Sequence, residues 1–153
     1  MDIDSADNET TAKWGVERIY GDALVRRWSE IVPLIDAALL HGSGSVTSYG
    51  LFIECLATVA QCWIDEDEYG DVRGAVITRF EDQEGTRIIA VIAASHPDWF
   101  AGGHETLERL EEFGRSEGCH KMNVYGRRGW LRVLAPRGYY EPYITLTKDL
   151  GGA

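Results

Sequence analysis

Apolar residues recur every three or four positions between Glu17 and Leu40, which is the spacing of one buried helix face. Asp22 is a candidate N-cap for this helix. Pro33 falls inside the pattern and lacks the N–H that a helix interior needs, so we expect a kink or break near Ile31. The loop from His41 to Ser45, rich in glycine and serine, ends this helical region.

A second, shorter helix is predicted to start at Thr47 or Ser48, either of which can act as its cap, and to run to about Ala57. The residues expected to face inward from it are Leu51, Phe52, Cys55 and Leu56.

From Thr58 the period becomes that of β-strands. Turns are predicted at Tyr69–Asp71 and Gln83–Gly85, because these short polar segments contain glycine. Turns this short favour an antiparallel meander. The three predicted strands are Val59–Asp67, Val72–Asp82 and Arg87–Ser95. The third is apolar on both faces, so we expect it in the interior of the sheet.

The stretch from Leu107 to Tyr139 predicts a helix, a strand and a second helix, with a glycine where each helix ends. A strand, a helix and a further strand in this order favour a crossover between parallel strands. The predicted elements are a helix at His104–Glu117 ended by Gly118, a strand at Lys121–Tyr125, a helix at Arg128–Ala135 and a last strand at Tyr143–Lys148.

Charge is unevenly distributed along the chain. The 153 residues carry a formal net charge of −10, which argues against nucleic-acid binding by the molecule as a whole. Between Gly118 and Tyr140, however, there are five basic residues and no acidic one. This split favours a local anion site or a docking surface on an acidic body.

No apolar run approaches the roughly 18 to 20 residues that a membrane span needs, so no membrane partner is predicted. Residues 1–16 are polar and acidic and lack a secretion signal, so we expect a flexible tail followed by one domain at 17–150 in a cytoplasmic protein. The three cysteines form no CxxC pair, which favours buried, reduced thiols and no metal site. Their positions are Cys55, Cys62 and Cys119.

The order of elements resembles that of the GNAT acetyltransferase superfamily. EFGRSEGCHKMNV looks like the third helix and fifth strand of that family, with Gly114 four residues before the terminal glycine. APRGYYEPYITLTKDL resembles its C-terminal strand. GRRGWLRVL is similar to a bacteriophage-encoded branch with a Gly-Arg-x-Gly-Trp motif. The resemblance covers about Leu24 to Leu150 and implies a single α+β domain, with a mixed sheet made of an antiparallel meander and a splayed parallel pair.

The resemblance also implies a binding site for acetyl-CoA. Main-chain groups of Ile92, Ala93 and Ala94 would hold the pantetheine arm. The loop glycines that wrap the pyrophosphate would correspond to Ala101, Gly102 and Gly103. The sequence departs from the family at Asp98, which stands where an arginine or glutamine is usual and would repel the pyrophosphate. An ordinary strand-to-helix turn therefore remains an alternative for this loop.

Candidates for the catalytic groups are few. Leu134 stands where many family members have a tyrosine that protonates the leaving thiolate. Acetyl transfer to an amine also needs a base, and the candidates are His96 and three acids near strand ends, Glu66, Glu68 and Glu81. Each has a plain structural alternative, as a loop histidine or as an acid near a strand end.

The basic turn after the fifth strand could bind an anion or a partner. Arg127, Arg128 and Arg132 could clamp a phosphate or an acidic protein, with Trp130 as an aromatic anchor. Alternatively, Trp130 faces the core and the arginines pair with the acids of the chain itself.

Three hypotheses for function follow. The first is an N-acyltransferase that moves an acetyl group from acetyl-CoA to a small-molecule or protein amine, with an atypical CoA loop. The second is a non-catalytic, phage-encoded GNAT-fold protein of the host cytoplasm or virion, with phage or host protein partners for its basic turn. The third is an unrelated ligand-binding α+β domain.

Overall fold

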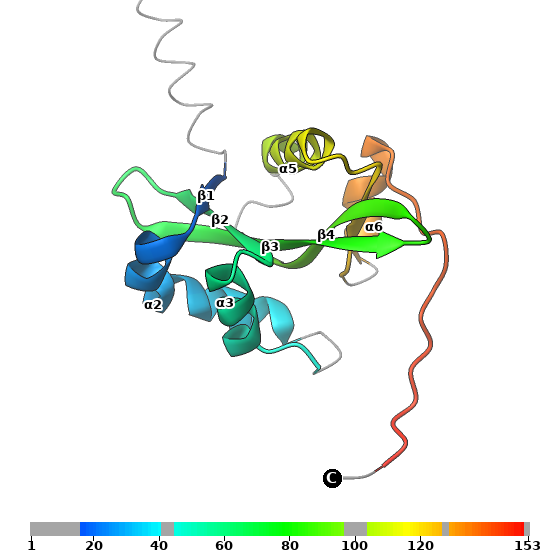
Figure 1. Cartoon of the computed structure of the whole chain (residues 1–153), viewed down its shortest axis with the longest axis horizontal. Coiled ribbons are helices and arrows are strands. Elements are labelled where there is room, and N and C mark those ends of the chain that lie inside the picture. Colours follow the sequence, from blue (N-terminus) through cyan, green and yellow to red (C-terminus); the bar gives the residue numbers. More distant parts are fainter. Residues whose placement is uncertain (1–15, 41–44, 97–103, 127–128, 152–153) are drawn as a thin grey trace, which may run out of the picture.

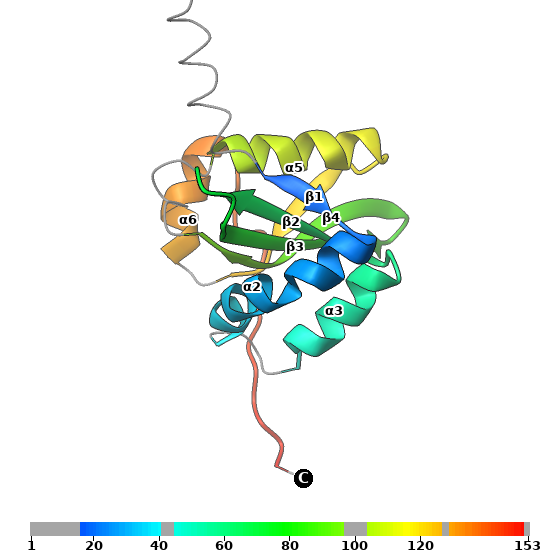
Figure 2. The same ribbon diagram turned by 90° about the vertical axis from the view of Figure 1, so that its left-hand side faces the viewer.

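A computed structural model describes residues 16–40, 45–96, 104–126 and 129–151. They form one five-stranded sheet of order β1-β2-β3-β4-β5. Figures 1 and 2 show α2 and α3 on one face of this sheet and α5 and α6 on the other. The elements are β1 Glu17–Ile19, α2 Gly21–Leu39, α3 Ser48–Leu56, β2 Ala60–Glu66, β3 Val72–Gln83, β4 Thr86–Ser95, α5 His104–Ser116, β5 Lys121–Val124, α6 Gly129–Leu134 and the 3-10 turn η1 Ala135–Arg137.

The sheet is mixed. β1 to β4 pair antiparallel in sequence order, and β4 pairs with β5 in parallel. This confirms the predicted meander, the parallel crossover pair and the interior position of β4. The fold class is α+β, as predicted. Within the described ranges, no helix is both long and apolar enough to cross a membrane.

The first helix differs from the prediction at its start. Glu17–Ile19 is a strand that pairs with β2, and α2 begins at Gly21 with Tyr20 as its N-cap, so Asp22 lies in the first turn instead of capping it. Of the two outcomes predicted near Ile31, a break into two helices is absent, since α2 is a single helix from Gly21 to Leu39. Pro33 lies on the exposed side of α2, where water can satisfy the carbonyl group that its missing N–H leaves without a bond.

The second helix matches the prediction closely. Thr47 is the N-cap of α3, and its hydroxyl accepts a hydrogen bond from the Gly50 N–H at 3.1 Å. Leu51 and Cys55 are buried. Leu56, at the end of the helix, is exposed, so the prediction that it faces inward was wrong.

The sheet separates two hydrophobic clusters. Under α2 and α3, the first includes Leu24, Ile31, Ile35 and Leu51 from the helices and alternate strand residues such as Ile64 and Ile77. Under α5 and α6, the second contains Val16, Trp63, Val76, Val91, Leu107, Leu110 and Leu134. Because side chains alternate along a strand, membership of a cluster shows which face each strand residue occupies.

The predicted last strand is not formed. Residues from Tyr139 to Gly151 have no secondary structure, and the apolar side chains between Tyr143 and Leu150 are exposed. Figure 1 shows this segment running away from the sheet, past the layer of α2 and α3. A strand forms only where another strand offers backbone groups to pair with, and the segment does not run along one. The prediction of a strand at Tyr143–Lys148 is therefore corrected.

Candidate active site at the end of β4

The parallel pairing of β4 with β5 ends in the middle of β4. The last paired residues are Val91 and Val124, and the Tyr125 N–H donates to the Val91 carbonyl at 3.1 Å. β4 continues to Ser95, still paired with β3. The side of β4 that faces β5 therefore carries backbone groups beyond Val91 that the β5 ladder does not reach.

A β-bulge lies at the same point. Thr78 of β3 pairs with Val91 and Ile77 pairs with Ala93, so Ile92 is an extra residue in β4. Ile92 and Ala93 both pack against the cluster under α2 and α3, as expected where a bulge interrupts the alternation of side chains. Bulges bend the strand that carries them, and this one lies just where the pairing of β4 with β5 ends.

His96 follows directly after β4 and reaches back across the sheet. Its Nε2 lies 2.5 Å from Oδ2 of Asp65, a buried residue of β2. Between them is Gly74 of β3, which pairs with Asp65. A Cβ at position 74 would lie 2.2 Å from Cδ2 of the imidazole, so only glycine leaves room for the ring to lie over β3.

Arg73 holds the same carboxylate. The register of β2 and β3 shifts here, since Asp65 pairs with Gly74 and Glu66 with Val72, so Arg73 is an extra residue in β3. Its Nε donates to Oδ2 of Asp65 at 2.8 Å. A carboxylate only accepts hydrogen bonds, so the contact between His96 and Asp65 is a donation from Nε2.

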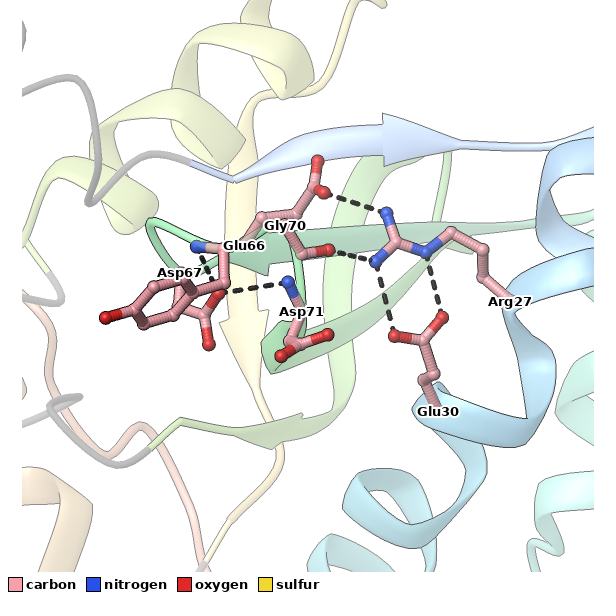
Figure 3. A network of polar contacts seen from close by, with 7 residues as sticks. Arg27, Glu30, Glu66, Asp67, Gly70 and Asp71 are labelled. Carbon is pink, nitrogen blue, oxygen red and sulfur yellow. Dashed lines mark hydrogen bonds and ion pairs between the residues drawn. The ribbon is translucent and has the colours of Figure 1, made fainter.

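A network of polar contacts fastens the neighbouring β2–β3 turn to α2 (Figure 3). Arg27 of α2 donates to Glu30 at 3.1 Å, to Glu66 at 2.9 Å and to the Gly70 carbonyl at 2.5 Å. Asp67 accepts two backbone N–H groups within the turn. The hydrogen bonds that Arg27 donates to Glu30 and Glu66 raise the pKa of Arg27, and the bond accepted from Arg27 lowers the pKa of Glu30.

The predicted cofactor and base residues lie only partly together. Ile92, Ala93 and Ala94 lie on β4 beyond the end of the β5 ladder, close in sequence to His96. Ala101, Gly102 and Gly103 lie outside the described residues, as does Asp98. Glu81 is elsewhere on the sheet, opposite Ile88 near the start of β4.

Glu81 makes a different contact. The Tyr125 hydroxyl donates to its Oε2 at 3.3 Å, and its Oε1 is buried without a hydrogen-bond partner among the described residues. Burial is the main cause that raises the pKa of Tyr125. Glu81 and His96 therefore do not form a common site.

The basic turn is only partly described. Arg127 and Arg128 lie outside the described residues. Trp130 packs against the cluster under α5 and α6, with its indole over Gly126, which supports the core-facing alternative. Arg132 is exposed on α6.

Leu134, the position at which the sequence resemblance implied a proton-donating tyrosine, is buried in the cluster under α5 and α6. The nearby Tyr139 uses its hydroxyl to donate to Glu111 of α5 at 2.6 Å. Burial, followed by this bond, raises the pKa of Tyr139. Tyr139 therefore ties α5 to the end of η1.

Sequence reasoning proposed His96 as a candidate but proposed none of its neighbours Asp65, Arg73 and Gly74. The signal for Gly74 was present, because a glycine inside a strand pattern often marks a bulge or a close approach. Asp65 looked like one of several acids at the end of a strand. In the described part of the chain, no group of three or more His, Cys, Asp and Glu side chains could hold a metal ion.

Neither a family model nor a curated protein sequence matches this chain. Its structure, however, is similar to those of several acetyltransferases. A ribosomal-protein-alanine N-acetyltransferase from Brucella melitensis matches with a TM-score of 0.65 at 12% identity, over 88% of this chain and 99% of that one.

Two further solved structures cover the chain to a similar extent. Glucosamine-6-phosphate N-acetyltransferase from Arabidopsis thaliana matches with a TM-score of 0.64 at 15% identity, over 89% of this chain and 97% of that one. An aminoglycoside acetyltransferase from an uncultured soil metagenomic sample matches with a TM-score of 0.65 at 13% identity, over 89% and 95%. The chain therefore has the GNAT fold. At these identities the likeness shows the fold alone.

Proposed function

We propose that this chain is an acetyl-CoA-dependent N-acyltransferase. The observation that carries the proposal is the coincidence of the Ile92 bulge with the end of the β4–β5 ladder at Val91. Beyond that point, backbone N–H and C=O groups of β4 face a gap in the pairing, as an extended amide-containing arm such as pantetheine requires. The fold shared with acetyltransferases supports the same activity.

In this proposal, His96 is the general base. An acceptor amine loses a proton as its nitrogen forms the amide bond and the thioester C–S bond breaks. His96 takes this proton, and Asp65 holds the imidazole in place through Nε2. Arg73 and Gly74 are positioning residues, since the first orients the carboxylate and the second leaves room for the ring. Leu134 supplies no proton to the leaving thiolate.

Binding and turnover test this proposal separately. Calorimetry with the full chain should show saturable binding of acetyl-CoA, and a panel of primary amines should be acetylated in its presence. His96→Ala should keep acetyl-CoA binding but lower kcat by about 10²- to 10⁴-fold, the usual contribution of a positioned base. Asp65→Asn should lower kcat less, because the imidazole keeps its place but loses the charged partner of Nε2.

The outcome that contradicts the proposal is the absence of any binding heat or thermal shift at millimolar acetyl-CoA. That result is what the hypothesis of a non-catalytic, phage-encoded protein predicts, so the experiment separates the two. If acetyl-CoA binds and His96→Ala has normal kcat, the enzyme remains and His96 is not its base.

A further inference from the structure

Arg18 on β1 carries a charge that the described part of the chain does not pair. Its Nε atom is buried and has no hydrogen-bond partner among the described residues. Its guanidinium instead lies over two aromatic rings, 5.7 Å from the centre of Phe113 and 5.9 Å from that of Tyr20. An aromatic face attracts a cation but offers no oxygen to accept its N–H groups. The guanidinium of Arg18 therefore keeps its capacity to bind an anion.

Arg109 on α5 lies beside the same aromatic rings. Its guanidinium is 5.4 Å from the ring centre of Trp63, the residue that pairs with Arg18 across β1 and β2. Trp63 and Phe113 meet edge to face, with their ring centres 4.9 Å apart. Because these two rings touch, the guanidinium groups that lie over them belong to one surface, on the face of the sheet that α5 covers.

The rings under the two arginines are held in place. Trp63 is buried, and its indole N–H donates to the Thr78 hydroxyl at 2.9 Å. That hydroxyl donates in turn to Oε1 of Gln61 at 2.8 Å. Phe113 also stacks on Phe80, with ring centres 5.8 Å apart. A site built on fixed rings loses less side-chain freedom when a ligand binds.

The acids of α5 do not neutralise Arg109. Glu105 precedes it by four residues and Glu112 follows it by three, which are the spacings at which acids and bases pair on a helix. Among the residues that the structure describes, however, neither Arg109 nor Arg18 forms an ion pair with a carboxylate. The chain has 25 acidic and 15 basic residues, so partners of its own are plentiful. Two arginines that share a surface without one point to an anion from outside.

We propose that Arg18 and Arg109 form a binding site for the phosphate group of a small phosphate monoester. Such a group carries a charge of about −1.5 to −2 near pH 7, which matches two guanidinium groups, and its oxygens suit their planar donors. Tyr20, which is 66% exposed beside Arg18, would contact the organic part of the ligand. Neither arginine forms a hydrogen bond or an ion pair with His96 or Asp65, so the site does not depend on the proposed base.

Titration of the full chain with phenyl phosphate tests the site. In nuclear magnetic resonance spectra, the Nε–H signals of Arg18 and Arg109 should shift and saturate. Arg18→Gln and Arg109→Gln should each raise the Kd by about tenfold or more, because each removes charge-assisted hydrogen bonds. Arg109 is exposed, so its variant should keep the fold even if the Arg18 variant does not.

Two controls separate a built site from general attraction. Arg26→Gln removes the same charge from an exposed position of α2, on the other face of the sheet, and should change the Kd by less than about twofold. Benzoate has the ring of phenyl phosphate but only one negative charge, and it should bind about tenfold more weakly. His96→Ala should bind phenyl phosphate as the wild type does, which tests the site independently of catalysis.

Three outcomes would overturn the proposal. The first is a titration in which the signals of Arg18 and Arg109 do not shift or do not saturate. The second is an equal loss of affinity in Arg26→Gln and Arg109→Gln, which would show attraction by overall charge. The third is benzoate binding as tight as that of phenyl phosphate, which would mean that the surface does not select a phosphate group.

Discussion

Gly74 is the residue on which the candidate site depends. It lies between Asp65 and His96 on the face covered by α5, and the imidazole occupies the volume that a side chain would fill. No unusual backbone angle demands a glycine there, since its φ is not in the left-handed region. The requirement is space, so even the smallest side chain should disturb the pair.

Gly74→Ala should therefore displace His96 while the sheet stays folded. A Cβ 2.2 Å from Cδ2 is far inside van der Waals contact, and the ring, at the end of β4, is freer to move than β3. We expect kcat to fall about as far as in His96→Ala, with the circular dichroism spectrum unchanged. Gly129→Ala is the control, because a Cβ there meets nothing within 4 Å. Normal turnover in Gly74→Ala would show that His96 need not lie over β3.

Sequence reasoning proposed His96 because it directly follows an apolar predicted strand. It could not reach Asp65, which is 31 positions away and lies beside His96 only because β2, β3 and β4 are neighbours in register. Arg73 was equally hidden, because it contacts Asp65 as the extra residue of a bulge. Contacts between strands depend on register, and a local pattern of residue types does not specify it.

At the scale of elements, Arg27 joins α2 to the β2–β3 turn. Its guanidinium contacts two carboxylates and one carbonyl, and its planar fork of donors suits such a set better than an ammonium group does. The turn that it holds begins at Glu66, next to Asp65. The contact therefore steadies one end of the candidate site from the opposite face of the sheet.

Arg27→Ala should lower the free energy of unfolding by about 1 to 2 kcal/mol, a modest value because Glu30 and Glu66 are largely exposed. Denaturant titration measures this change. Arg26→Ala, at an exposed neighbouring position, should change it by less than about 0.5 kcal/mol. Equal effects of the two variants would mean that the contacts of Arg27 add nothing to stability.

Prediction of the elements succeeded where periodicity and turn residues agreed, as for α3, β3 and α5. It failed at Glu17–Ile19, which forms a strand through pairing with β2. It also failed at Tyr143–Lys148, where strand-forming residues have no strand beside them. In both places the outcome depends on a distant partner, and local propensity carries no information about one.

At the scale of the whole molecule, the three cysteine thiols differ in burial. Cys55 and Cys62 are buried in the cluster under α2 and α3, whereas Cys119 is half-buried after α5. Burial is the main cause that raises the pKa of Cys55 to about 12, and it also raises the pKa of Cys62. Buried, protonated thiols do not react with alkylating agents, so their reaction requires unfolding.

Native protein treated with iodoacetamide should therefore be labelled first at Cys119. Cys55 and Cys62 should react together, at a rate that follows the global unfolding equilibrium in denaturant. Because the folded pKa of Cys55 is raised, its contribution to stability is intact below the unfolded value of about 8.5 and is lost as the pH rises through about 12. Mass spectrometry of Cys119→Ser, which should resist labelling, is the control. Rapid labelling of Cys62 alone would reveal local opening of β2.

The fold class itself followed from the sequence. Short turns specified the antiparallel meander, and the long connection through α5 specified the parallel pair. The GNAT fold of the chain confirms the predicted fold class. It could be predicted because the order of elements leaves few ways to arrange them. The roles of individual residues do not follow in the same way, since one fold supports many chemistries.

The extra residue at Ile92 also decides which side of the sheet receives everything after it. Val91 faces α5, and in an uninterrupted strand an odd number of steps would carry His96 to the opposite side, beneath α2. At the bulge, Ile92 and Ala93 both face α2 and α3, and this returns His96 to the side of Asp65. Because Ile92 is the extra residue, a regular strand without it would keep His96 on the side of Asp65, whereas a strand that kept Ile92 but lost the bulge would turn His96 to the other side. The candidate site therefore depends on which face of the sheet each residue of β4 occupies as much as on which residues β4 contains.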